Sequence, residues 1–189
     1  MGSPPFFYPQ WAEGKNQLMK TLYAVILIMT STSTMAHPVF ENSTAQAGVV
    51  FKAELMITHG CGNSPTVKVI VDVPEDVLKI TPQIKDGWSI ETKESHLETP
   101  REVFGMTRTK YTSQIIWSGG SVPVDYFDVF SFIVIPPANA ATLYFPTIQV
   151  CEEGEDRYTT IPDAENVGEH IPGGAPSVLV VEAADGGGH

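Results

Sequence analysis

The chain has 189 residues and a formal net charge of −11 at pH 7, from 22 acidic and 11 basic residues. This balance argues against a nucleic-acid partner, because phosphate backbones are bound by basic patches. The length suffices for one domain with a sizeable core. The acidic surface is compatible with attracting cations, although most acidic surfaces only keep a protein soluble.

The N-terminal segment has the layout of a secretory signal. Lys20 begins an apolar run, and small and hydroxyl-bearing residues lead from it to Ala36. A basic start, a short apolar core and a small residue at the cut are typical of such signals. Residues 1–18 fit no part of the signal, so Met19 is the more natural start of translation. We expect residues 1–36 to be an extension and a cleaved signal peptide, which predicts a periplasmic or secreted protein.

Cleavage after Ala36 leaves an exported domain that begins at His37 and keeps most of the charge. Only Lys15, Lys20 and Glu13 are removed, so nine of the 11 basic and 21 of the 22 acidic residues remain, a net charge of −12. No apolar run in this part is long enough to span a bilayer. We therefore expect no transmembrane span after cleavage.

From His37 onward, apolar and polar residues alternate with the period of half-buried strands. Residues 51–58 place on one face Phe51, Ala53, Leu55 and Ile57. Residues 66–73 do the same with Val67, Val69, Val71 and Val73. Further strands are predicted at 87–93, 102–108, 110–118, 126–135, 141–150 and 176–182. Short strands separated by turns, with no convincing amphipathic helix, predict an all-β fold, an antiparallel β-sandwich.

Glycine and proline mark the ends of these predicted strands. We expect Gly119-Gly120 to join two strands and Pro136-Pro137 to stop the strand before it. Residues 152–174 are acidic and rich in glycine and proline, which indicates a long loop before the last strand. The domain then extends over residues 37–183 and is followed by a flexible tail at 184–189.

Two cysteines, Cys61 and Cys151, lie in the exported part, 90 positions apart. In an oxidising compartment they are expected to form a disulfide. A chain-entropy model gives such a crosslink roughly 4 to 5 kcal/mol of stability as an upper figure. The alternative is a thiolate metal site, but the spacing lacks the paired Cys-x-x-Cys of such sites.

His37 is the first candidate metal ligand. As the mature N-terminus it offers a free α-amine and an imidazole Nδ1, two nitrogens that together suit Cu(II). Pro38 has no amide hydrogen, so the backbone nitrogen at that position cannot wrap the metal, and a two-point brace is favoured. The plainer alternative is a frayed N-terminus without function.

Two further residues could complete such a site. His59 follows the strand 51–58 beside Cys61, where a disulfide would fix its imidazole; alternatively it is only a hydrogen-bonded turn residue. Tyr158 lies outside a clear strand and is a candidate for lining the site. The remaining polar candidates are weaker: Glu41 and Glu54 fit a solvated face, His96 and His170 lie in polar loop segments, and His189 lies in the tail.

Other chemistry receives little support. The aromatic residues in strand patterns are expected in the core, namely Trp88, Trp117, Phe130, Phe132 and Tyr144. There is no Gly-x-Ser-x-Gly, no His-Glu-x-x-His and no phosphate-cradling glycine loop. Conventional hydrolysis is therefore not indicated.

Taken together, these residues resemble the YcnI-like copper-binding domain family (DUF1775) of exported proteins. The resemblance rests on a series of blocks in the expected order: His37, Ala47-Gly48, His59-Gly60-Cys61, Ser64-Pro65-Thr66, Pro82, Gly87-Trp88, and residues 116–120, 126–130, 143–146 and 149–152. They span about 37 to 182, nearly the whole mature chain. The blocks are specific as a set, although no single one is.

The resemblance implies an immunoglobulin-like sandwich that binds Cu(II) through the amine and imidazole of His37. Members of the bacillus type complete the site with a glutamate and a tryptophan, and this sequence departs from both. The His59-Gly60-Cys61 turn stands where the glutamate would align, and Tyr158 stands where the tryptophan would align. We infer that His59 takes the place of the carboxylate.

The sequence therefore predicts a non-enzymatic copper-binding protein that acts in copper storage, delivery or homeostasis. Its partners would be the copper ion and other copper-handling proteins of the envelope. The alternative is a copper-dependent monooxygenase, since such enzymes also use an N-terminal histidine brace on a β-sandwich. A plain structural or adhesion module is a third interpretation, in which the histidines are incidental.

Overall fold

The structure, a computed structural model, describes residue 2, residues 37–163 and residues 171–183. Contacts divide the chain into Met1–Met35 and a domain, Ala36–His189. The predicted signal peptide, the tail at 184–189, His170 and His189 lie outside the described residues. In the part of the chain that is described, no helix is long and apolar enough to cross a membrane.

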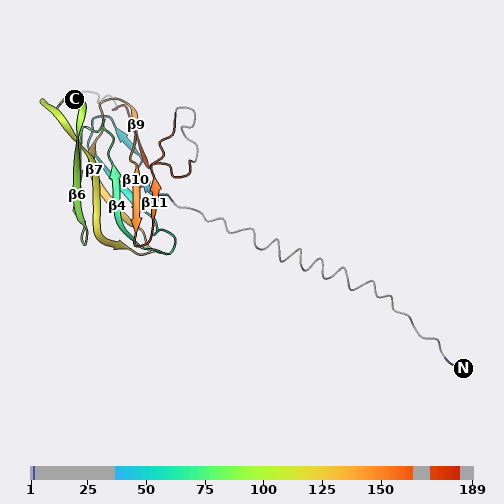
Figure 1. Cartoon of the computed structure of the whole chain (residues 1–189). Coiled ribbons are helices and arrows are strands. Elements are labelled where there is room, and N and C mark those ends of the chain that lie inside the picture. Colours follow the sequence, from blue (N-terminus) through green and yellow to red (C-terminus); the bar gives the residue numbers. More distant parts are fainter. Residues whose placement is uncertain (1, 3–36, 164–170, 184–189) are drawn as a thin grey trace, which may run out of the picture. The chain divides into compact units, whose positions relative to one another are not determined.

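The described domain is built from twelve strands (Figure 1). In chain order they are β1 (Val39–Phe40), β2 (Thr44–Gln46), β3 (Phe51–Ile57), β4 (Thr66–Asp72), β5 (Lys79–Pro82), β6 (Ser89–Val103), β7 (Met106–Val122), β8 (Asp128–Ile135), β9 (Ala141–Tyr144), β10 (Thr147–Cys151), β11 (Glu155–Tyr158) and β12 (Ser177–Val181).

Two antiparallel sheets enclose one core. The four-stranded sheet has the order β1-β3-β8-β5, and the five-stranded sheet has the order β11-β10-β4-β7-β6, whose members stand side by side in Figure 1. A smaller sheet, β2-β12-β9, contains a parallel pair, β2 with β12. The outer strands are thus β1 and β5 in one large sheet and β11 and β6 in the other.

Alternation along the strands explains the core, because successive side chains point to opposite faces of a sheet. The core cluster takes Ala53, Leu55 and Ile57 from β3. It adds large aromatic rings from β8 of the same sheet and β7 of the other large sheet, namely Phe130, Phe132 and Trp117. The fold is therefore the all-β, immunoglobulin-like antiparallel sandwich that the sequence predicts, and these three aromatic residues lie in its core as expected.

Several strand boundaries differ from the prediction. The expected strand 141–150 is two strands in different sheets, separated by Phe145 and Pro146. Proline cannot donate to a strand ladder, so the chain changes sheets there. In β4 the register shifts between Thr66 and Lys68, and Thr66 rather than Val67 is buried.

The prediction for Gly119-Gly120 was wrong, since both residues lie inside β7. A Cβ on Gly120 would come within 2.2 Å of the Trp88 ring, so only glycine lets that indole lie against the strand. Trp88 in turn meets the Phe130 ring edge-on at 5.0 Å and packs against the core while remaining partly exposed. The glycine therefore serves packing rather than a turn.

Candidate metal site at the rim of the sandwich

His37 lies two residues before the start of β1, the outer strand of the four-stranded sheet. Its ring packs edge-on against the ring of Tyr158, with centroids 5.3 Å apart and an interplanar angle of 66°. Tyr158 ends β11, the outer strand of the five-stranded sheet. The contact therefore joins the two sheets along one open edge of the sandwich, which we call the His37 rim.

Tyr158 is buried, with 1% of its surface exposed, and its hydroxyl has no hydrogen-bond partner among the described residues. Burial raises the pKa of Tyr158 to about 12, and the nearby Asp156 carboxylate adds to this shift. The side chain therefore stays a neutral phenol at physiological pH. A buried hydroxyl without a partner carries a desolvation cost, so it needs an explanation.

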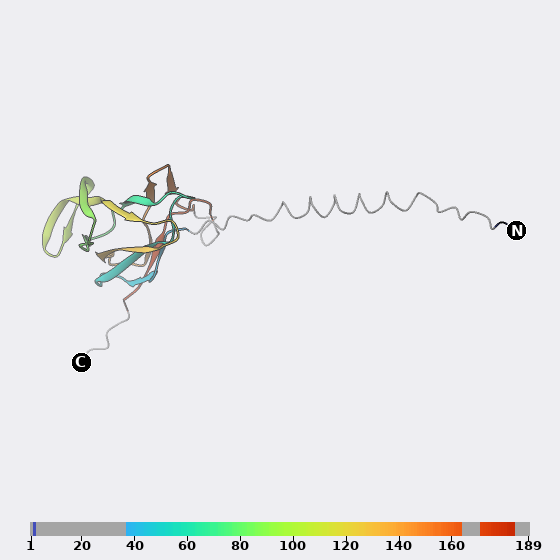
Figure 2. The same cartoon turned by 90° about the horizontal axis from the view of Figure 1, so that it is seen from below.

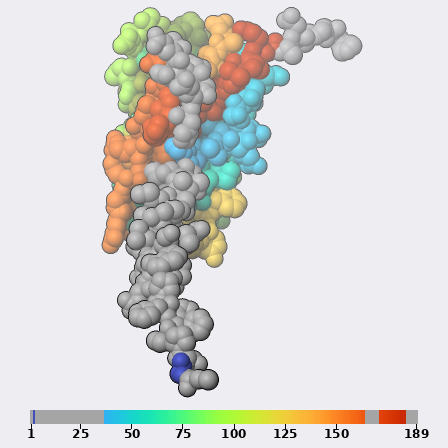
Figure 3. Space-filling view, turned by 90° about the vertical axis from the view of Figure 1, so that its right-hand side faces the viewer, coloured from blue at the N-terminus to red at the C-terminus, as the bar shows by residue number. Residues whose placement is uncertain are grey.

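An open hollow of about 460 Å³ adjoins His37. Its wall includes Tyr144 from β9, Ser177 from β12, and Pro162 and Ile171. Two backbone hydrogen bonds join the residues after β11 to those before β12. The Thr160 amide donates to the Gly173 carbonyl at 2.9 Å, and the Ala175 amide donates to the Thr160 carbonyl at 2.9 Å. In Figure 3 the blue start of the domain lies beside the orange segment that contains β10 and β11.

The turn that carries His59 follows β3, the neighbour of β1. In this pair Val39 lies opposite Met56 and Phe40 opposite Leu55. Continuing the same antiparallel register by two residues sets His37 opposite Thr58, directly before His59. The structure therefore places His37 and the His59 turn at the same end of the β1–β3 pair.

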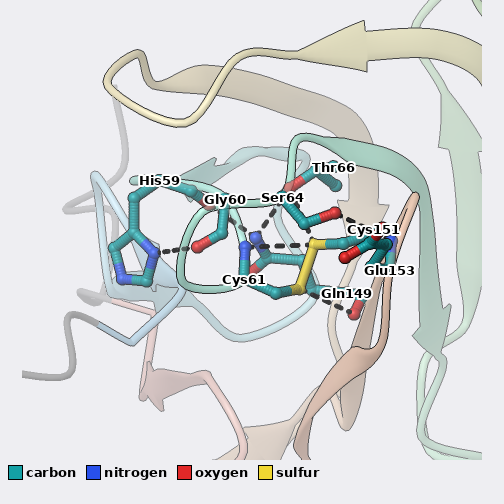
Figure 4. Close-up of a disulfide and its surroundings, with 8 residues drawn as sticks. All are labelled: His59, Gly60, Cys61, Ser64, Thr66, Gln149, Cys151 and Glu153. Atoms are coloured by element: carbon teal, nitrogen blue, oxygen red, sulfur yellow. Dashed lines mark hydrogen bonds between the residues drawn. A yellow bond between two sulfur atoms is a disulfide. The ribbon is translucent and has the colours of Figure 1, made fainter.

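The His59 turn is tightly fixed. Cys61 and Ser64 exchange two backbone hydrogen bonds of 3.0 Å each. A Cβ on Gly60 would approach the Ser64 carbonyl oxygen to 2.2 Å, which explains glycine at this position. The buried amide of Gln149, on β10, donates to the His59 carbonyl at 2.5 Å and to the Thr66 hydroxyl at 2.7 Å (Figure 4).

Within this turn the His59 ring points away from the disulfide, as Figure 4 shows. Its Nδ1 donates to the Gly60 carbonyl. In the neutral ring this bond assigns the proton to Nδ1 and leaves the lone pair on Nε2. Nε2 is therefore the nitrogen through which His59 would bind a metal.

Cys61 and Cys151 form the predicted disulfide, with their Cα atoms 6.0 Å apart. It ties the His59 turn to the end of β10. β11 folds back along β10 and pairs Tyr158 with Thr147, four positions along β10 from Cys151. Tyr158 also belongs to a strand, contrary to the prediction that it lies in a loop.

The other candidate ligands are placed less favourably. Glu54 pairs with Lys52 at 2.5 Å, and Glu41 is exposed. His96 is also exposed, and it lies within β6 rather than in a loop. Across the described residues, no group of three or more histidine, cysteine or acidic side chains could hold one metal ion. A metal at the His37 rim would thus need donors other than such a side-chain cluster.

Two residues of this region were missed by sequence reasoning. Tyr144 was assigned to the core but lines the hollow beside His37. Gln149 was not singled out, although its neighbours on the same face of β10, Thr147 and Cys151, are buried. An amide at an inward position of a strand must find hydrogen-bond partners, and that signal could have identified it.

A family model described as "Domain of unknown function (DUF1775)" matches residues 37–180. The chain belongs to this family. The match begins at His37, the residue that the signal pattern predicts as the mature N-terminus. It covers nearly all of the described domain.

Among solved structures, the domain is similar to an uncharacterised protein from Nocardia farcinica described as having an immunoglobulin-like fold. The identity is 17%, the TM-score is 0.57, and the match covers 77% of this chain and 98% of that one. This likeness supports the fold alone.

A family 123 glycoside hydrolase from Clostridium perfringens also matches, at 10% identity over 80% of this chain and 24% of that one. With a TM-score of 0.33, that match carries no argument. No curated protein matches the chain.

Proposed function

We propose that this is an exported copper-binding protein that holds Cu(II) through the α-amine and the imidazole of His37. The observation that carries the proposal is the position of His37 at the sandwich rim, where its ring packs against the ring of Tyr158, a buried residue whose hydroxyl has no hydrogen-bond partner among the described residues. Resemblance to YcnI-like proteins supports the choice of metal. The role proposed is copper storage, delivery or homeostasis in the periplasm or outside the cell, without catalysis.

The donors proposed at the rim are nitrogen atoms of His37 and His59, and nitrogen donors suit Cu(II). A chain cut before His37 supplies two nitrogens from one residue, which suits Cu(II). His59 lies in the turn at the same end of β1 and β3, and its Nε2 is the natural third donor. Among the described residues there is no cluster of three or more acidic, histidine or cysteine side chains, so those at the rim offer no carboxylate set that would favour calcium or magnesium instead. Bound copper would supply redox and Lewis-acid chemistry, and the residues here would hold it and limit access to it.

Titration calorimetry with Cu(II) tests the proposal directly. Protein that begins at His37 should bind one equivalent tightly, whereas protein that keeps Ala36 before it should bind at least about a hundredfold more weakly, because the amine becomes an amide. That ratio corresponds to roughly 2.7 kcal/mol, a plausible loss for one of two chelating donors. Equal affinities would refute the brace.

Two further measurements separate the alternatives. Electron paramagnetic resonance of the Cu(II) form should report nitrogen ligands, at least two in number. Incubation of the copper form with a reductant and candidate glycans should yield no oxidised products. Oxidised products would instead support the monooxygenase, and absence of stoichiometric copper in the isolated protein would support a structural module.

A further inference from the structure

A second hollow lies at the opposite edge of the sandwich, between β5 and the β6–β7 hairpin. In Figure 2 this hairpin, coloured green to yellow, projects from one side of the domain. The cavity measures about 210 Å³, room for roughly seven water molecules at 30 Å³ each. It is too small for a drug-sized ligand and suits a small molecule.

Positive charge is concentrated at this cavity. Four basic side chains line it, namely Lys79, Arg101, Arg108 and Lys110, whereas Glu94 is its one acidic lining residue. They are four of only nine lysines and arginines in residues 37–189, a segment that contains 21 acidic residues. Such a gathering runs against the charge of the whole domain. It creates a local positive field at the cavity.

The pairing of β6 with β7 places two of these basic side chains opposite each other, which is unfavourable unless a negative charge lies nearby. Arg101 lies directly opposite Arg108 on the neighbouring strand, and like charges in that position repel each other. Arg101 donates to the Glu75 carbonyl at 2.7 Å and approaches its carboxylate at 3.4 Å. Arg108 makes no ion pair with any described residue. Among the described residues, only Arg101 of this pair therefore has a carboxylate partner.

The other cations are also poorly balanced. Lys110 is 3.8 Å from Glu94, and both side chains are at least half exposed, a geometry that contributes little. Lys79 is exposed and makes no ion pair within the described residues. An anion in the cavity would therefore meet cations that the protein itself leaves largely unpaired.

The cavity also has an apolar side. Leu78, Ile80 and Tyr111 line it and are only half-buried, so part of their surface stays uncovered. An inorganic anion would leave this surface without a partner, whereas a ligand with an apolar body would cover it. We propose that the cavity binds a small organic anion, a carboxylate or phosphate group attached to a compact apolar body. This site is independent of the copper proposal.

Titration of the isotope-labelled full chain, followed by amide NMR shifts, tests the site with four probes. Benzoate and phenyl phosphate carry an anion and an apolar ring, benzamide keeps the ring without the charge, and acetate keeps the charge without the ring. We expect saturable shifts at β5 and at the β6–β7 hairpin with one or both ring anions, which distinguishes carboxylate from phosphate. Benzamide and acetate should bind at least about tenfold more weakly.

Matched substitutions decide whether the cavity carries the binding. Arg108→Gln should weaken binding of the ring anion at least about tenfold, the loss expected for one charge-assisted contact. It should not lower the melting temperature, since Arg108 makes no ion pair with the described residues. Lys93→Gln removes the same charge from β6 outside the cavity lining and should leave affinity unchanged.

Three results would overturn the proposal. They are the absence of saturable shifts with both ring anions, equal binding of benzamide and benzoate, and equal weakening by Arg108→Gln and Lys93→Gln. The last would mean that the anions respond only to overall charge.

Discussion

The ring of His37 meets the ring of Tyr158 edge-on, with 5.3 Å between their centroids, and this contact bridges the outer strands of the two large sheets. His37 held in this way differs from a residue of a frayed end, because it is half-buried and its ring is packed. The hydroxyl of Tyr158 has no hydrogen-bond partner within the described residues. The rim therefore combines an ordered imidazole with an unpaired hydroxyl, and the first predictions concern that pair.

Tyr158→Phe separates stability from metal binding. The substitution keeps the ring contact and removes a buried hydroxyl without a partner, so we expect metal-free protein to gain about 1 kcal/mol of unfolding free energy. If the hydroxyl serves the copper site, Cu(II) affinity should fall severalfold in the same variant. Urea unfolding and calorimetry measure the two effects. Tyr111→Phe, at a half-buried position on β7, is the matched control and should leave copper affinity unchanged.

Alkaline pH should destabilise the metal-free protein through Tyr158. Its folded pKa of about 12 exceeds the ordinary value of 10.0, so the folded state holds this proton more tightly than the unfolded state. The stabilising contribution is complete below pH 10 and is lost as the pH rises through 12, in total about 2 to 3 kcal/mol. Unfolding free energies measured between pH 9 and 12 should fall less steeply in Tyr158→Phe. Identical slopes would contradict this assignment.

Much of the fold could be predicted from the sequence, because β3, β4, β7 and β8 bury one face and therefore alternate clearly. The strands that were missed are short or lie at sheet edges, namely β1, β2, β5 and β11. β11 reads Glu-Asp-Arg-Tyr and buries only its tyrosine. Edge strands are often charged because charge discourages pairing with other chains, and the same charge hides them from a search for apolar alternation.

The parts of the candidate site that follow from a residue's place in the sequence could be predicted. The parts that depend on which strands pair with each other could not. The signal pattern pointed to His37, and the cysteine count pointed to the disulfide. The contact between His37 and Tyr158 depends on β11 folding back along β10, which local sequence does not encode. Tyr144 looked like a core residue because strand alternation cannot distinguish a packed core from the wall of a hollow.

His59→Ala tests whether this residue supplies the third copper donor. If Nε2 binds the metal, Cu(II) affinity should fall about tenfold or more, and the paramagnetic resonance spectrum should lose one nitrogen. Stability should fall by about 1 kcal/mol, the usual value of one hydrogen bond, because the ring loses its bond to the Gly60 carbonyl while Gln149 still holds the backbone carbonyl of His59. His96→Ala, at an exposed histidine of β6, is the control. Unchanged affinity and spectrum in His59→Ala would limit the site to His37.

Gln149→Leu should lower the unfolding free energy, although leucine and glutamine are similar in size. The substitution removes the donor to the His59 carbonyl and to the Thr66 hydroxyl. Leaving those buried acceptors unpaired costs about 1 to 3 kcal/mol. Denaturant unfolding measures the loss. Gln114→Leu is a suitable comparison, because Gln114 donates only to the partly exposed Asp72, and it should cost clearly less.

The disulfide prediction concerns both stability and the metal. Cys61→Ala with Cys151→Ala removes a crosslink between residues 90 positions apart, for which chain entropy gives roughly 4 to 5 kcal/mol as an upper figure. We expect a measured loss of about 3 kcal/mol, because the turn keeps the two backbone hydrogen bonds between positions 61 and 64 and the bond from Gln149 to the His59 carbonyl.

Those other bonds limit the effect on copper. Gln149 still holds the His59 carbonyl, and the Glu153 amide still donates to the Ser64 hydroxyl at 2.8 Å. The His59 ring should therefore stay near its place, and Cu(II) affinity should fall less than tenfold. A much larger loss, at temperatures where the variant remains folded, would mean that the sulfurs themselves bind metal. Non-reducing mass spectrometry of the isolated native protein completes the test, since two free thiols would contradict the crosslink.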